Sequence, residues 1–94
     1  MRPGYVYIVT NPAWPGFVKV GAAKTLEGRL ADYQTASPLR DFKLTFAAHF
    51  NDRFIAEGRL KAALRGLRVR GTEWFQIHPD DARAVLIKIQ DRHP

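Results

Sequence analysis

The segment GYVYIVTNPAWPGFVKVG, from Gly4 to Gly21, most constrains how this chain can fold. It holds two short runs of β-branched and aromatic residues, Tyr5–Val9 and Phe17–Val20, on either side of a loop with two prolines. Such residues favour strands, whereas proline cannot donate a backbone hydrogen bond to a sheet. The segment therefore predicts an antiparallel hairpin whose strands are joined by a loop over residues 11–16.

The rest of the chain alternates between helical and extended patterns. Helices are predicted at about Leu26–Tyr33, with Thr25 as N-cap, at Arg53–Leu67, with Asn51 or Asp52 as N-cap, and from Pro79 onward. Strands are predicted at Glu73–Ile77 and at Phe42–Phe50, with the even-numbered residues of the latter, all apolar, on one face. The order β-β-α-β-α-β-α predicts a small α+β sandwich, mainly an antiparallel sheet flanked by helices, as a single domain over residues 1–94.

Composition narrows the classes of protein to which the chain can belong. Its 94 residues suffice for one compact domain, and 46% of them are hydrophobic. Because there is no cysteine, disulfides, thiolate metal sites and a cysteine nucleophile are excluded. No apolar run approaches the length of a membrane span, so we expect a cytoplasmic protein without a membrane partner.

The positive charge is concentrated in one segment. The chain has a net charge of +6, and Arg53–Arg70 accounts for +5 of it, with Glu57 as its single acidic residue. The basic residues of the segment are Arg53, Arg59, Lys61, Arg65, Arg68 and Arg70. This concentration favours a stripe that faces the phosphates of a nucleic acid. The alternative is a solvated helix face followed by a basic turn.

The hairpin brings a phenol and an ammonium group to the same side of the sheet. Strand alternation places Tyr5 and Tyr7 on one face, and Lys19 shares this face if the hairpin pairs Tyr7 near Lys19. A nearby cation favours the phenolate form, which would make Tyr7 a usable general base. Gly21, directly beyond, would let a backbone or a phosphate approach closely.

The order of these features resembles that of a known superfamily. With Tyr7 in a first motif and Lys19–Gly21 as a second, the chain resembles the GIY-YIG nuclease superfamily, most closely the phage and bacterial branch whose second motif reads V-K-I-G. Arg29 follows the second motif on the first predicted helix, and Glu57 lies on the second. GTEWFQI, over Gly71–Ile77, is similar to the strand that follows in this branch.

The resemblance implies a metal-dependent endonuclease acting on DNA, as a monomer, a homodimer or part of a larger assembly, with RNA as a substrate that the residues leave open. It implies that Tyr7 activates the attacking water and that Lys19 assists Tyr7 or binds the phosphate. Arg29 would stabilise charge on the phosphate, and Glu57 would hold one Mg²⁺ or Mn²⁺ ion. Phosphodiester hydrolysis needs such a base, cations and a metal carboxylate, so we expect the four residues to converge on one concave surface.

A second interpretation stays open, namely a catalytically weak or inactive binding module on the same scaffold. Taken alone, Tyr7 is typical of a half-buried strand residue, and Glu57 has the helical spacing to pair with Arg53 or Lys61. Trp14 stands between two prolines in an exposed loop. It either packs over the sheet edge or stacks on a base or a partner protein.

Overall fold

The computed structural model describes residues 1–94 and contains one four-stranded sheet with three α-helices. The elements in chain order are β1 (Gly4–Thr10), β2 (Phe17–Ala23), α1 (Arg29–Gln34), β3 (Lys43–Phe50), α2 (Arg53–Ala63), a 3₁₀ turn (Arg65–Leu67), β4 (Trp74–Gln76) and α3 (Pro79–Arg92). The sheet is antiparallel throughout, with strand order β3-β1-β2-β4. The predicted α+β class and element order are confirmed.

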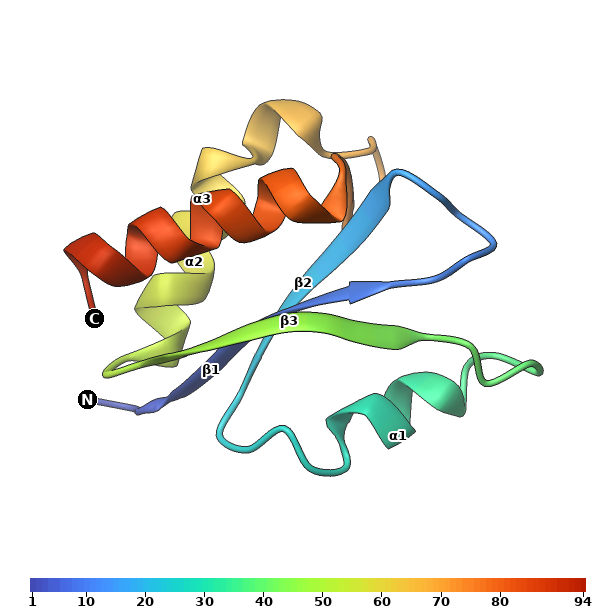
Figure 1. Cartoon of the computed structure of the whole chain (residues 1–94), viewed down its shortest axis with the longest axis horizontal. Coiled ribbons are helices and arrows are strands. Elements are labelled where there is room, and N and C mark those ends of the chain that lie inside the picture. Colours follow the sequence, from blue (N-terminus) through green and yellow to red (C-terminus); the bar gives the residue numbers. More distant parts are fainter.

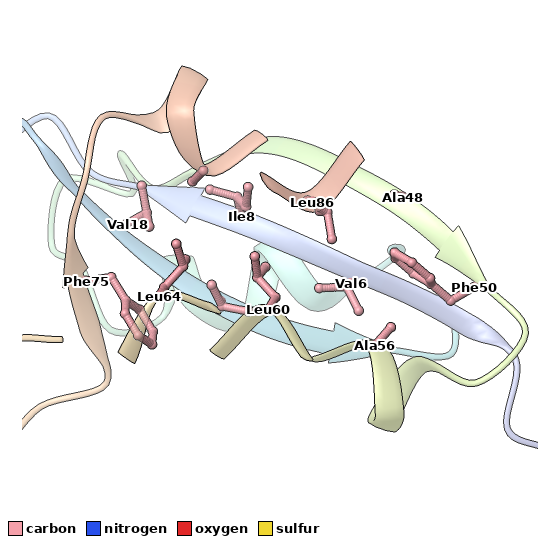
Figure 2. Packing of buried hydrophobic residues seen from close by; sticks show 12 residues of the cluster. Val6, Ile8, Val18, Ala48, Phe50, Ala56, Leu60, Leu64, Phe75 and Leu86 are labelled. Atoms are coloured by element: carbon pink, nitrogen blue, oxygen red, sulfur yellow. The ribbon is translucent and has the colours of Figure 1, made fainter. Parts of the chain in front are cut away.

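The helices cover the two faces of the sheet unequally. Figure 1 shows α1 on one face and α2 with α3 on the other. The larger core lies under α2 and α3, where Val6 and Ile8 of β1 meet Leu60 and Leu86 of the two helices (Figure 2). The smaller core lies under α1. None of the three helices combines the length and the apolar character needed to cross a lipid bilayer.

A β-bulge divides β3 between these two cores. Ile8 pairs with Phe46, but the next residue of β1, Val9, pairs with Leu44, so Thr45 is an extra residue. Because one inserted residue reverses the alternation of side chains, Phe46 packs under α2 and α3 whereas Leu44 packs on the α1 side. The prediction that all even-numbered residues of this strand share one face is therefore wrong.

Helix α1 begins later than predicted. Its N-cap is Gly28, with φ 76°, and no side chain caps the helix. Glycine adopts this left-handed conformation without the steric cost that other residues meet there. The expected cap at Thr25 is wrong because the chain turns sharply at Gly28 before the helix can start.

Helix α2 begins where the sequence predicts and ends earlier. The Asp52 carboxylate accepts hydrogen bonds from the backbone N–H groups of Phe54 and Ile55 at 3.1 and 3.2 Å, as an N-cap does. The α-helix ends at Ala63, and Leu67 lies exposed in the 3₁₀ turn that follows. The predicted helix was therefore too long at its C-terminal end.

The register of the hairpin also differs from the expected one. Tyr7 pairs with Gly21, and Lys19 pairs with Val9, so the phenol and the ammonium share a face but not a pair. A Cβ atom on Gly21 would overlap the phenol group of Tyr7, so the tyrosine ring lies across the glycine. The space that Gly21 leaves is thus occupied by Tyr7 and not by a phosphate.

This contact predicts opposite outcomes for two glycine substitutions. We expect Gly21→Ala to lower the free energy of unfolding by about 1–3 kcal/mol, because the added methyl group overpacks against the Tyr7 ring. Gly58→Ala, in the interior of α2 with open space around it, should raise that energy by about 0.5–1 kcal/mol. Urea unfolding of both variants checks this, and a Gly21→Ala protein as stable as the parent would contradict it.

Candidate functional site

Two tyrosines form a hydroxyl pair under α1. Tyr7 comes from β1 and is only 2% exposed, while Tyr33 comes from α1 and is partly buried. Their hydroxyl oxygens lie 3.3 Å apart, and the rings meet edge to face with centroids 6.1 Å apart. The sheet and α1 thus hold two phenol groups in one fixed contact.

The surroundings of Tyr33 shift the pKa of its phenol. Burial raises the pKa of Tyr33 above its ordinary value, and the hydrogen bond and charge of Tyr7 raise it further. The guanidinium of Arg29 lowers this pKa in part. Because Tyr33 keeps its proton at neutral pH, its hydroxyl can serve as the donor to the Tyr7 oxygen.

Two cations lie next to this phenol pair. The Nζ atom of Lys19 lies 5.4 Å from the centroid of the Tyr33 ring and 3.3 Å from the Oε2 atom of Glu73. Arg29 begins α1, one turn before Tyr33, and its charge acts on that phenol. Three of the four predicted residues, Tyr7, Lys19 and Arg29, therefore gather around Tyr33.

Glu57 lies apart from these three residues. It belongs to α2, whose Ala56 and Leu60 pack on the opposite face of the sheet. Its carboxylate pairs with Lys61 at 3.5 Å, and no hydrogen bond or ion pair joins it to Tyr7, Lys19 or Arg29. Lys61 in turn lines a pocket together with Glu73, the ion-pair partner of Lys19.

Few side chains are placed to act as ligands of a metal ion. No group of three or more histidine, aspartate or glutamate side chains is placed to hold one. Glu57 is 22% exposed and offers a single carboxylate. This donor suits Mg²⁺ or Mn²⁺, since Mg²⁺ usually keeps several waters and takes only one or two carboxylates from a protein.

The predicted basic residues lie at separate places. Lys61, Arg65 and Arg68 line the pocket with Glu73, which has a volume of about 230 Å³. Arg59 lines a different groove, with Lys88 and Arg92 of α3. Arg53 donates to the Pro3 carbonyl and covers the Phe54 ring, and Arg70 is exposed in the turn before β4. Only the first group adjoins the Lys19–Glu73 pair.

A family model described as the T5orf172 domain matches residues 4–90. The chain belongs to the T5orf172 domain family. Because the matching model is this one and not a GIY-YIG model, the family assignment drawn from the motifs is corrected. No curated protein and no solved structure shows a significant match to the chain.

Two residues of this T5orf172 domain site were missing from the predicted set. Tyr33 was named only as the last residue of the first predicted helix, although its spacing of one turn from Arg29 places the two on one helix face. The sequence did not indicate Glu73 as a site residue, because its pairing with Lys19 depends on how β4 aligns with β2. Both were found from contacts between distant segments.

The raised pKa of Tyr33 predicts how the stability of this T5orf172 domain depends on alkaline pH. Unfolding lets Tyr33 return to an ordinary pKa of 10.0, so the stability it contributes is fully present below pH 10 and is lost as pH rises above it. Tyr33→Phe removes this titration. We expect the urea midpoint of the parent to fall more steeply above pH 10 than that of Tyr33→Phe, and equal slopes would contradict the assignment.

Proposed function

We propose that this T5orf172 domain is a metal-dependent endonuclease that hydrolyses phosphodiester bonds of DNA. The observation that carries the proposal is the meeting of the Tyr7–Tyr33 hydroxyl pair with Lys19 and Arg29 on one face of the sheet. A base with cations beside it is what hydrolysis of a phosphodiester requires, because negative charge grows on the phosphate in the transition state.

Each residue of this group has a role in the proposal. Acting as a phenolate, the Tyr7 oxygen accepts the proton of the attacking water and becomes a phenol, and the Tyr33 hydroxyl orients that oxygen. Lys19 and Arg29 bind the phosphate oxygens and stabilise their charge. Glu73 holds Lys19 in place through the 3.3 Å ion pair.

Glu57 is the residue proposed to hold Mg²⁺ or Mn²⁺. When bound, such an ion supplies a Lewis acid that stabilises the leaving oxygen. The carboxylate is partly exposed and its lysine partner is 3.5 Å away, so the side chain is accessible from solvent. Water and substrate oxygens would complete the ligand set.

The pocket lined by Lys61, Arg65 and Arg68 supports a nucleic acid as the partner. Clustered basic side chains neutralise the phosphates of a strand that runs along them. The pocket shares Glu73 with the Lys19 ion pair, so a strand bound there would pass close to the phenol pair. DNA in preference to RNA, a monomer or homodimer, and a cytoplasmic location belong to the same proposal.

A specific observation favours a second candidate, a nucleic-acid-binding module without catalysis. The two carboxylates of the proposal are paired with lysines, Glu57 with Lys61 and Glu73 with Lys19. A carboxylate that is already neutralised by a lysine binds a metal ion less strongly, since the ion must displace the ammonium. The binding module would hold the same strand but leave it intact.

Incubation with supercoiled plasmid and with single-stranded DNA, in Mn²⁺, Mg²⁺ or EDTA, separates the two candidates. We expect cleavage by the parent in the presence of metal and none in EDTA. Glu57→Gln keeps the shape but removes the charge, and should slow cleavage by roughly 100-fold or more. Asp91→Asn, an exposed carboxylate near the end of α3, is the matched control and should cleave like the parent.

One result would count against the nuclease, and another would count against Glu57 as the residue that holds the ion. Failure of the parent to cleave either DNA in any of the metals would favour the binding module. Metal-dependent cleavage that is as fast in Glu57→Gln as in the parent would show that another group holds the ion.

A further inference from the structure

An aromatic cleft of about 290 Å³ lies beside the proposed site, between the β1–β2 loop and β4. Its lining consists of Trp14, Phe17, Val69, Thr72 and Trp74. The one hydroxyl in the lining, that of Thr72, already donates to the Val69 carbonyl at 2.9 Å and accepts from the Trp74 N–H at 3.1 Å. A ligand here would therefore be held by ring contacts more than by hydrogen bonds.

Trp14 is held half exposed at the mouth of this cleft. It is 50% exposed, yet its ring contacts Trp74 with centroids 5.5 Å apart and Phe42 with centroids 6.3 Å apart. The loop that carries it is braced by Asn11, whose side chain accepts from the Ala13 N–H and donates to Asp41, both at 2.9 Å. An aromatic ring fixed in this way loses little freedom when a ligand stacks on it.

Positive charge lies along the rim of the cleft. The Arg68 guanidinium donates to the Thr72 carbonyl at 2.7 Å, and Arg70 is exposed in the same turn. Arg68 also lines the neighbouring basic pocket, so this one side chain contacts both that pocket and Thr72 in the lining of the cleft. Aromatic platforms next to a basic groove are how proteins hold single-stranded nucleic acids.

We propose that the cleft receives one unpaired base of a single-stranded nucleic acid, whose phosphates lie on Arg68 and Arg70. The identity of the polyanion rests on the proposed function, while the need for an unpaired base is new. The cleft has a volume of about 290 Å³. Small-ligand pockets begin at about 300 Å³, so a cleft of this size suits one base. A base stacked within a duplex cannot enter such a cleft unless it leaves the stack.

The cleft is also connected to the phenol pair. Ring centroids are 6.4 Å apart between Trp74 and Phe42, and 5.7 Å apart between Phe42 and Tyr33. Tyr33 in turn holds the Tyr7 hydroxyl. A base on Trp14 would therefore fix the strand at one end of a continuous aromatic row that ends at the proposed catalytic phenol.

Two strands with the same number of phosphates test the proposal, a short homothymidine strand and a fully abasic strand. Binding is measured in EDTA by the anisotropy of a labelled strand, so the result does not depend on cleavage. We expect the parent to bind the thymidine strand about 5- to 100-fold more tightly, the range that one stacked base supplies. Both tryptophans of the chain line the cleft, so quenching of their emission by the thymidine strand alone would report its occupancy.

The variants test whether Trp14 makes this difference. Trp14→Ala should bring the two affinities together, and Trp14→Leu, which keeps apolar packing without a π-face, should do the same if the alanine variant fails to fold. Ile55→Ala is the matched control, because Ile55 is 51% exposed in the first turn of α2 and lies outside the cleft. Ile55→Ala should retain the full preference for thymidine.

Four outcomes are decisive. Equal binding of both strands by the parent, or an unchanged preference in folded Trp14→Ala and Trp14→Leu, would overturn the cleft as a base site while leaving the nuclease proposal intact. Binding of neither strand by the parent would also overturn the cleft as a base site, while the plasmid assay with metal still decides the nuclease proposal. A thymidine preference without cleavage would support the cleft and count against the nuclease.

Discussion

The contact between the Tyr7 ring and the backbone of Gly21 sets the geometry of the proposed site. A side chain on Gly21 would collide with the phenol, so glycine is the residue that lets the ring lie across β2. From that position the Tyr7 hydroxyl reaches Tyr33 on α1 at 3.3 Å. Lys19 and Arg29 both lie next to Tyr33, so the contact between the two tyrosines also brings these cations close to Tyr7.

The two faces of the sheet carry different kinds of side chain. The face under α2 and α3 is filled mainly by aliphatic side chains and supplies most of the buried core. The face under α1 carries Tyr7, Tyr33, Phe42 and Trp74, and the aromatic cleft opens at its edge. The bulge at Thr45 contributes to this division, because it leaves Phe42 and Leu44 on the α1 face although the later even-numbered residues of β3 pack under α2 and α3. A regular strand would have sent Phe42 into the larger core.

Most features that depend on neighbouring residues were predicted well from the sequence, although the cap at Thr25 and the end of α2 were not. The hairpin, the element order and the cap at Asp52 all follow from local patterns, and the structure confirms them. Features that depend on the alignment of distant segments were not predicted from the sequence. The pairing of Tyr7 with Gly21, the extra residue at Thr45 and the pairing of Lys19 with Glu73 each depend on how two strands slide against each other.

The residues predicted for the candidate site were likewise only partly confirmed as neighbours. Tyr7, Lys19 and Arg29 were predicted and do meet, whereas Glu57 lies on a helix that covers the other face. The motifs that suggested these residues also suggested a superfamily, which the match to the T5orf172 domain corrects. Short motifs therefore located residues that lie together but assigned the family wrongly.

The central claim is that the Tyr7 hydroxyl takes part in phosphodiester cleavage and is more than a packing group. The most direct test is the rate of plasmid cleavage in Mn²⁺ by Tyr7→Phe, with Tyr5→Phe, on the same strand, as the matched control. Tyr7→Phe keeps the ring over Gly21, so the account predicts a folded protein whose rate falls by roughly 100-fold or more, while Tyr5→Phe cleaves like the parent. Cleavage by Tyr7→Phe at the rate of an active parent would contradict the account.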